Sequence, residues 1–377
     1  MSQRIARFLC LLLVAVTGSA LCAEPPPAGS PPKLDFKAYY LADFATGTVL
    51  ASSNAEEQLP PASLTKLMTA YLVFGALKSG GIRLDDQARV SVKAWHQSGT
   101  RMFIEPNSHV AVEDLVRGML IQSGNDASVA LAEHVGGSVD DFVVQMNAAA
   151  KKLGMKNTQW RNPNGLPARD HYTTAHDLAI LAHAIIAEFP EYYRLYSERE
   201  FSYNGITQHN RNQLLWRDPS VDGMKTGYTS AAGYCLVSSA ERDGMRLIAV
   251  VLGAQNPRLR NDGAKKLLDY GFANYETRKL YSAGQQIETA PVRNGEAEFA
   301  GVGPANDIFV TIPRGGMALL QASMDRLEDL VAPIAAGATV GKVNVSFAGR
   351  QLASTPLVVL GGVAEGGVWS RLKSALK

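Results

Sequence analysis

Pro60-Pro61-Ala62-Ser63-Leu64-Thr65-Lys66 breaks the chain with two prolines and then starts an apolar helical pattern. After this stretch, Leu67, Met68, Tyr71, Leu72 and Leu77 recur at the spacing of one helical face. The pattern predicts a helix that begins at or beside Ser63. Free N–H groups at a helix N-terminus favour negative charge, and residues three apart share a face. We therefore expect the hydroxyl of Ser63 and the amine of Lys66 to lie side by side.

Two further motifs follow in a fixed order. Ser123-Gly124-Asn125 begins 60 residues after Ser63, and Lys225-Thr226-Gly227 begins a further 102 residues on. An S-x-x-K pair alone arises by chance about once every few hundred residues, and a serine at a helix start is most often only a cap. All three motifs in this order, each beside a predicted helix or strand, indicate an acyl-transferring serine enzyme.

The first two motifs supply a nucleophile and its bases. Ser63 needs a base, and because no histidine stands at a partnered position we assign that role to Lys66. Burial and the nearby charge of Lys225 would lower the pKa of Lys66 enough to make it one. Ser123 is suited to relay a proton from Lys66 to the leaving amine. Asn125 can orient Lys66 and hydrogen-bond an amide of the substrate.

The third motif is suited to hold the end of a peptide. In Lys225-Thr226-Gly227 the ammonium and the hydroxyl can bind a terminal carboxylate, and the glycine lets a peptide approach the strand edge. The backbone N–H groups of Ser63 and Tyr228 are expected to form the oxyanion hole. Arg211 either assists at the carboxylate or pairs with an acidic neighbour, and the sequence leaves both possibilities open.

With these motifs the chain resembles the low-molecular-mass penicillin-binding proteins, serine-type D-alanyl-D-alanine carboxypeptidases of peptidase family S11. The resemblance extends over nearly the whole chain beyond its leader and includes Asn210–Leu215, Val221–Gly223, Ala232–Tyr234, Thr174–Ala179 and Lys265–Leu268. It implies an α/β (α+β) penicillin-binding, β-lactamase-like domain with helices flanking an antiparallel sheet. It also implies cleavage of the terminal D-alanine from peptidoglycan stem pentapeptides through an acyl-serine, acylation of Ser63 by β-lactam antibiotics, and no cofactor.

The motifs bear on three alternatives to this function. A class A β-lactamase needs a glutamate in an E-x-x-L-N signature, which the sequence lacks, and Gly124 suits the carboxypeptidases better. A D,D-endopeptidase would use the same apparatus, although the added C-terminal domain argues against it. An inactive peptidoglycan- or penicillin-binding protein is disfavoured by the complete motif set. Familiar members of the family have histidine where this chain has Tyr228, so substrate preference there can differ.

Changes in composition divide the chain into five predicted parts. They are a signal peptide, a proline-rich linker, the catalytic domain, a glycine-rich all-β domain and an amphipathic tail, at residues 1–23, 24–36, 37–275, 276–364 and 365–377. Within the catalytic domain we expect strands at 38–43, 48–51, 233–238 and 247–253, and helices at 112–121, 127–135, 142–153, 175–186 and 263–270.

The two ends of the chain predict export to a membrane surface. Two arginines precede an apolar run that is too short to span a bilayer comfortably, which is typical of a secretory signal peptide; a retained anchor is the alternative. In the tail Trp369, Leu372 and Leu376 share one helical face, and we expect a weak peripheral contact with the membrane. The alternative is a frayed C-terminal tail that does not bind the membrane. Together these features place the protein on the periplasmic side of a bacterial inner membrane.

The overall composition excludes several other classes. The chain has 377 residues, of which 46% are hydrophobic and 19% charged, as in soluble globular proteins. Without the two leader arginines, 35 basic residues balance 35 acidic ones, which argues against a nucleic-acid partner. The seven histidines have no metal-ligand spacing, so we expect no metal site. Cleavage of the leader would leave Cys235 alone, with no internal disulfide.

Overall fold

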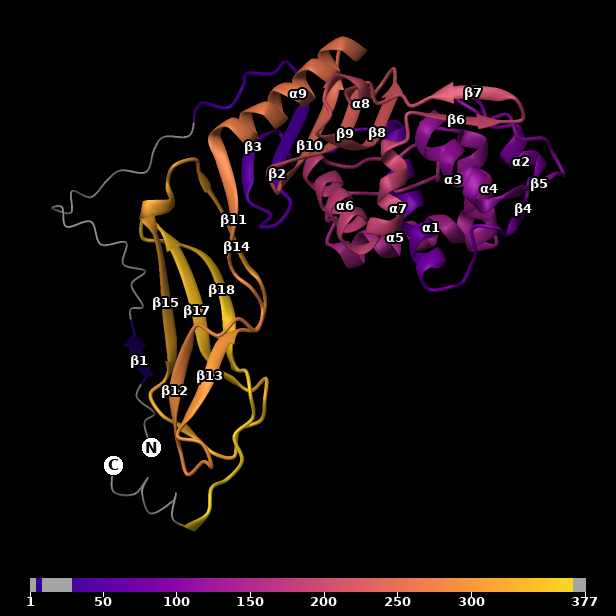
Figure 1. Ribbon diagram of the computed structural model, residues 1–377. Helices are drawn as coiled ribbons and strands as arrows, with labels where there is room; N and C mark the ends of the chain where they lie inside the picture. The colour runs from indigo at the N-terminus through magenta and orange to yellow at the C-terminus, as the bar shows by residue number, and fades with distance from the viewer. Residues whose placement is uncertain (1–4, 9–28, 369–377) are drawn as a thin grey trace. The chain divides into compact units, whose positions relative to one another are not determined.

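The computed structural model describes residues 5–8 and 29–368 (Figure 1). The described residues form two compact units, one of residues 30–273 and another of residues 5–8, 29 and 274–368. The predicted boundary between the catalytic and β domains falls at the first residues of β11 (Tyr275–Tyr281).

The larger unit is built on a five-stranded antiparallel sheet, in the order β3-β2-β10-β9-β8. Its strands are β2 Ala38–Asp43, β3 Val49–Ser53, β8 Val221–Thr229, β9 Gly233–Arg242 and β10 Met245–Ala254. The turn between β9 and β10 is Asp243-Gly244, with positive φ angles of 50° and 77°. Two such residues match the twist of a two-residue hairpin, which explains why this pair connects the two longest strands of the sheet.

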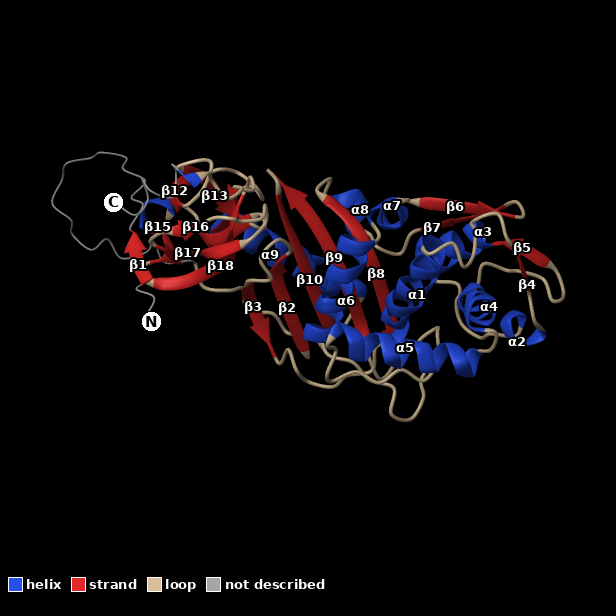
Figure 2. Ribbon diagram, turned by 90° about the horizontal axis from the view of Figure 1, so that it is seen from below, coloured by secondary structure: helices blue, strands red, loops and turns tan. Residues whose placement is uncertain are grey.

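Helices cover both faces of this sheet (Figure 2). The helices of the larger unit are α1 Lys66–Lys78, α2 Val92–Trp95, α3 Val112–Arg117, α4 Asn125–Gly136, α5 Val139–Leu153, α6 Ala175–Glu188, α7 Pro190–Tyr193, α8 Leu214–Arg217 and α9 Pro257–Asn274. Because side chains alternate along a strand, Tyr40 faces the core shared with α1 and α6, while Leu41 faces α9. A Cβ at Gly271 of α9 would lie 2.5 Å from Leu247, so glycine lets that helix approach the sheet closely.

Two small two-stranded sheets and three short helical turns, one of them a 3₁₀ turn at Arg194–Ser197, complete the larger unit. The two sheets pair β4 Gln87–Arg89 with β5 His109–Ala111, and β6 Glu200–Tyr203 with β7 Ile206–His209; the second pair is a hairpin. The turns that carry motif residues are a 3₁₀ turn at Ala62–Thr65, directly before α1, and a π-helical turn at Gly118–Gln122, directly before Ser123.

The smaller unit is all β. Its strands besides β11 are β1 Ile5–Phe8, β12 Glu288–Arg293, β13 Phe299–Pro304, β14 Ile308–Pro313, β15 Leu320–Leu327, β16 Leu330–Val331, β17 Thr339–Phe347 and β18 Arg350–Val359. Seven of them form one sheet in the order β1-β15-β17-β18-β13-β12-β16, and β11 pairs with β14. Alternate residues such as Val343, Val345 and Leu357 fill its core. The predicted fold class, an α/β domain with an antiparallel sheet followed by a small all-β domain, is confirmed.

The expected elements are present, with longer bounds in several places. The helix expected at 263–270 is α9, which begins six residues earlier at Pro257. Its first turns lack an apolar pattern in the sequence because the residues buried there, Arg260 and Asn261, are polar. The hairpin of β6 and β7 was not predicted, because its alternation is weak and all its residues are partly or fully exposed.

The ends of the chain are only partly described. Residues 5–8 of the predicted leader form β1, antiparallel to β15, and the other leader residues lie outside the described part. The tail prediction falls mostly on residues 369–377, which also lie outside it. In residues 5–8 and 29–368, no helix combines the length and apolar character needed to cross a membrane.

Candidate active site

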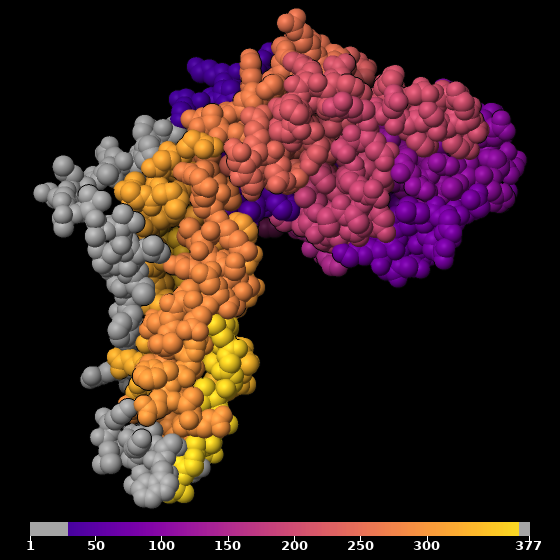
Figure 3. Space-filling model, in the orientation of Figure 1, coloured from indigo at the N-terminus to yellow at the C-terminus, as the bar shows by residue number. Residues whose placement is uncertain are grey.

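The three motifs meet at one cavity of about 780 Å³ in the larger unit. Its lining includes the predicted residues Ser63, Ser123, Asn125, Arg211, Thr226, Gly227 and Tyr228. Lys66 and Lys225 are buried beside it. On the surface of this unit, purple and pink segments that are far apart in the sequence adjoin (Figure 3). The fold therefore brings together all nine residues that the sequence singled out.

The nucleophile candidate is held in a tightly packed turn. Ser63 lies in the 3₁₀ turn before α1, and the preceding Ala62 has a φ of 48°, which is rare for a residue with a side chain. A Cβ at Gly165 would lie 1.8 Å from the Ala62 carbonyl oxygen, and one at Gly227 would lie 3.2 Å from the Ser63 nitrogen. The absence of a side chain at Gly227 thus lets the turn that carries Ser63 pack closely against β8. The sequence did not suggest this role for the glycine.

Lys66 is fully enclosed by acceptors and by the nucleophile. Its Nζ lies 2.9 Å from Ser63 Oγ, 2.7 Å from Asn125 Oδ1 and 2.6 Å from the backbone oxygen of Asn164. The side chain has no exposed area. Burial first, and the charge of Lys225 second, hold the pKa of Lys66 well below its ordinary value, while Asp126 opposes this shift. These are the direction and the two causes expected from the sequence.

The second motif is fixed by its own backbone and by a buried carboxylate. Asn125 donates from Nδ2 to the Ser98 oxygen at 2.7 Å, which turns its Oδ1 toward the lysine. Ser123 follows the π-helical turn with a φ of 70°. A Cβ at Gly124 would lie 2.9 Å from Asp126 Oδ1. Asp126 also accepts hydrogen bonds from backbone N–H groups of Met102 and Phe103, so it ties the segment across the cavity to α4.

Three cations gather at the other side of the cavity. Arg211 and Arg260 line it, and both lower the pKa of Lys225. The Nε of Arg211 donates to the backbone oxygen of Gln122 at 3.3 Å. Within residues 5–8 and 29–368, neither arginine has a carboxylate close enough for an ion pair. Of the two possibilities left open for Arg211, the acidic partner is therefore absent from the described chain.

The charges of this group are strongly affected by burial. Lys225 is 2% exposed, and burial, followed by Arg211 and Arg260, lowers its pKa to about 7. Its Nζ donates to the backbone oxygen of Thr226 at 3.1 Å. Arg260 is 6% exposed, and burial lowers its pKa to about 10. Buried cations without a counter-charge are costly, so this end of the cavity is suited to an anion.

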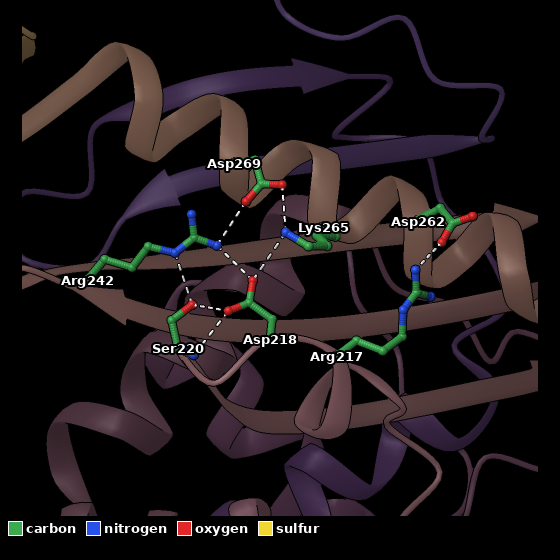
Figure 4. A network of polar contacts seen from close by, with 7 residues as sticks. All are labelled: Arg217, Asp218, Ser220, Arg242, Asp262, Lys265 and Asp269. Atoms are coloured by element: carbon green, nitrogen blue, oxygen red, sulfur yellow. Dashed lines mark hydrogen bonds and ion pairs between the residues drawn. The ribbon is translucent and has the colours of Figure 1, made fainter.

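Helix α9, which carries Arg260, is held to the sheet by an ionic network (Figure 4). Asp218 accepts hydrogen bonds from Ser220 at 2.6 Å and from Arg242 at 2.7 Å. Arg242 also binds Asp269 of α9 at 2.9 Å, and Lys265 of α9 binds the same Asp269 at 2.8 Å. The network joins α9 to the end of β9 and to the loop before β8, and so fixes the helix beside the cavity.

Tyr228 gives the cavity an aromatic edge. Its side chain is 54% exposed and stacks on Tyr234 of β9, with ring centroids 4.2 Å apart and an angle of 27° between planes. The two residues are direct partners across β8 and β9, which explains the stack. Both line the cavity.

Comparison with known proteins agrees with this geometry. The sequence profile of the peptidase S11 family, D-alanyl-D-alanine carboxypeptidase, matches residues 26–256, and that of the penicillin-binding protein 5 C-terminal domain matches residues 275–365. The chain belongs to the S11 family of D-alanyl-D-alanine carboxypeptidases. The family consists of serine-type peptidases, so the chain is a hydrolase.

Individual members of the S11 family are similar over most of the chain. D-alanyl-D-alanine carboxypeptidase DacA of Haemophilus influenzae is 41% identical, over 95% of this chain and 93% of that protein. The structure of penicillin-binding protein 5 from Haemophilus influenzae superimposes with a TM-score of 0.83 at 42% identity, covering 89% of this chain and 100% of that one. Penicillin-binding protein D2 from Listeria monocytogenes, solved in an ampicillin-bound form, has a TM-score of 0.60 at 32% identity, covering 65% and 100%.

Three components of this S11 site were not identified from the sequence. The backbone oxygen of Asn164 leaves no signal in a residue type, although Asn162-Pro163-Asn164-Gly165 was recognisable as a turn. Arg260 lies in the part of α9 that the apolar pattern did not reach. Asp126 directly follows the second motif, and its position at the first turn of α4 was the only available signal.

Proposed function

We propose that this serine-type carboxypeptidase removes the terminal D-alanine from peptidoglycan stem pentapeptides through an acyl-Ser63 intermediate. The observation that carries the proposal is the 2.9 Å contact between Lys66 Nζ and Ser63 Oγ inside a cavity that ends in three cations. The hydroxyl attacks the carbonyl carbon of the penultimate residue, D-alanine leaves as an amine, and water then hydrolyses the ester.

The surroundings of Lys66 support its role as the base. A neutral amine has two N–H bonds and one lone pair. Asn125 Oδ1 and the Asn164 oxygen are positioned to accept the two hydrogens, at 2.7 and 2.6 Å. The lone pair is then directed at Ser63 Oγ, where it can take the hydroxyl proton during attack. Ser123, at the cavity wall, would pass that proton to the departing amine.

The cation group supports an exopeptidase. Lys225, Arg211 and Arg260 form a positive end to the cavity, and a free terminal carboxylate supplies the missing anion there. The hydroxyl of Thr226 lies beside them. The backbone N–H groups of Ser63 and Tyr228 would stabilise the oxyanion, a contribution of about 3 kcal/mol for such a donor.

Mass spectrometry after brief exposure to benzylpenicillin tests the nucleophile. We expect a single adduct on the peptide containing Ser63, none in Ser63→Ala, and a normal adduct in the control Ser79→Ala, which changes an exposed serine after α1. The wild type should release free D-alanine from a pentapeptide mimic, and Ser63→Ala should release none. An adduct on another residue, or D-alanine release by Ser63→Ala, would refute the assignment.

Adduct lifetime and product analysis separate the alternatives. An adduct that persists for many minutes excludes a class A β-lactamase, whereas rapid recovery of free enzyme would favour one. An inactive binding protein would form the adduct yet release no D-alanine. Cleavage of a cross-linked dimer peptide at a rate above that of the pentapeptide would indicate an endopeptidase.

We further propose export to the periplasmic face of a bacterial inner membrane, with the tail as a weak peripheral contact. Support comes from the leader pattern and the amphipathic pattern of residues 365–377. Cleavage after Ala23 would remove β1 and leave β15 at the edge of its sheet. N-terminal sequencing of the cell-associated protein checks the cleavage. Co-sedimentation with anionic lipid vesicles, with and without residues 369–377, checks the tail; equal binding by both forms would refute its role.

A further inference from the structure

A chain of hydrogen bonds runs from a buried histidine to the turn that carries Ser63. The backbone N–H of Arg161 donates to His171 Nδ1 at 2.9 Å, and His171 Nε2 lies 2.9 Å from Thr65 Oγ1. Thr65 Oγ1 donates to the carbonyl oxygen of Ala62, also at 2.9 Å. His171 was not singled out in the sequence and is 106 residues from Thr65.

The direction of these hydrogen bonds is fixed. Because Nδ1 of His171 accepts from a backbone N–H, the ring proton is on Nε2, which donates to the Thr65 hydroxyl. The hydroxyl has one hydrogen and directs it to Ala62. Each donor therefore has one acceptor. If Thr65 instead donated to Nε2, the ring proton would move to Nδ1 and the N–H of Arg161 would lose its acceptor.

The hydrogen-bond chain from Arg161 to Ala62 is shielded from water. His171 is 7% exposed, and Thr65 and Ala62 are buried. Trp160 meets the histidine ring edge-to-face, with centroids 5.8 Å apart and an angle of 65°. Water therefore cannot replace a lost partner easily, and removal of one link leaves buried polar groups unsatisfied.

The charged groups around the histidine keep it neutral. Burial, then the charge of Arg161, lowers the pKa of His171 to about 4. The Arg161 guanidinium lies 3.7 Å from Asp170, and Lys66 follows Thr65 in the chain. The ring therefore keeps the same tautomer throughout the neutral range.

These hydrogen bonds end on Ala62, the strained residue directly before the nucleophile. Ala62 has a left-handed backbone, and such a conformation persists only where its surroundings impose it. Rotation of the peptide between Ala62 and Ser63 would move both the Ser63 N–H and its hydroxyl. We propose that His171 is a positioning residue, which acts through Thr65 to lock the turn that presents Ser63 to Lys66. The inference rests on the proposed role of Ser63 as nucleophile.

Two matched pairs of variants test it. Thr65→Val removes the hydroxyl at similar volume, whereas Thr65→Ser keeps it. His171→Asn keeps an acceptor near Nδ1 but does not reach Thr65, whereas His171→Gln places an N–H near the position of Nε2. The control is His109→Asn, which changes an exposed histidine of β5. For each we would measure the acylation rate with a fluorescent penicillin, the binding constant that precedes acylation, and the unfolding midpoint.

We expect Thr65→Val and His171→Asn to slow acylation about tenfold or more with little change in the preceding binding constant. Thr65→Ser and His171→Gln should restore most of the rate. The double variant of Thr65→Val and His171→Asn should be no slower than the slower single one, because both break the same chain.

Three results would overturn the positioning role. They are acylation within threefold of wild type in Thr65→Val and His171→Asn, losses that multiply in the double variant, or equal losses in both members of each pair. Failure of the proposed function is distinguishable, because then the wild type itself would form no adduct at Ser63, or would form the adduct and release no D-alanine. If Thr65→Val does not fold, the His171 pair alone decides between the outcomes.

Discussion

Lys66 and Lys225 are both buried lysines of one cavity, and the structure gives them opposite surroundings. Lys66 meets three oxygen atoms within 2.9 Å, one of them the hydroxyl that it would activate. Lys225 has one backbone acceptor at 3.1 Å and two arginines nearby. Burial lowers the pKa of both side chains, so burial alone does not assign their roles.

The difference lies in what each amine lacks. Around Lys66 the acceptors suit a neutral amine whose lone pair remains for Ser63. Around Lys225 the missing component is an anion, which a substrate carboxylate would supply. The two sites are also coupled, because the charge of Lys225 is the second cause of the lowered pKa of Lys66.

The largest effect is expected from Lys66→Arg, which keeps a positive charge but cannot act as a base at neutral pH. Acylation by penicillin should fall about 10²- to 10⁴-fold, the usual contribution of a positioned base. The matched control is Lys78→Arg, an exposed lysine at the end of α1, and should acylate normally. Stopped-flow fluorescence measures both. A normal rate in Lys66→Arg would exclude lysine as the base.

The next effect is expected from Lys225→Met. Loss of the cation should lower kcat/KM for a pentapeptide mimic about 10- to 100-fold, with a smaller loss for a mimic whose C-terminus is amidated. Because a like charge is removed, the pKa of Lys66 should rise, and the acid limb of the acylation rate should move to higher pH. An unshifted acid limb would show that the two lysines are not coupled.

A smaller effect is expected from Arg260→Gln. Lys225 has a pKa of about 7 and binds a carboxylate only when charged, so KM should rise as pH increases through 7. Removing Arg260 removes a like charge, which raises the pKa of Lys225 and moves this increase in KM upward in pH. Arg258→Gln, on the exposed side of α9, is the control. Identical pH profiles for the two variants would contradict a role for Arg260.

A further effect, on stability rather than on activity, is expected from the titration of His171, a third buried base that is kept neutral. Its pKa is about 4 when folded and about 6.5 when unfolded, so the unfolded chain binds the extra proton between these values. Stability from this group is complete above pH 6.5 and is lost as pH falls toward 4, by about 3 kcal/mol in total. Urea unfolding between pH 7 and 4 measures the loss, which should be reduced in His171→Gln. An equal loss in that variant would assign the acid sensitivity to other groups.

Much of this site could be predicted because its chemistry depends on residue types at fixed positions. Ser63, Lys66, Asn125 and Lys225 each need one particular functional group, and the helices and strands that carry them have regular apolar patterns. Four strands of the sheet and the all-β unit were likewise predicted from alternation and turn residues, whereas the antiparallel sheet as a whole was implied by the resemblance to the family.

The rest depends on long-range packing. The backbone oxygen of Asn164 would be present with any residue at that position, so only the path of the chain brings it to Lys66. Arg260 comes from the polar first turns of α9, where its own side chain is buried and lines the cavity. The link between His171 and Thr65 joins residues that nothing in the local sequence relates to each other.

The turn before α1 packs against two glycines, Gly165 and Gly227, where there is no space for a Cβ atom at ordinary contact distance. Any side chain at Gly165 would overlap the Ala62 carbonyl, and one at Gly227 would press on the Ser63 nitrogen. For protein engineering this means that transplanting the nucleophile, the base and the cations into another scaffold is insufficient. A graft must also include two glycines that contact the turn, one from a loop and one from a strand. Descriptions of an active site that name only its reactive side chains omit them.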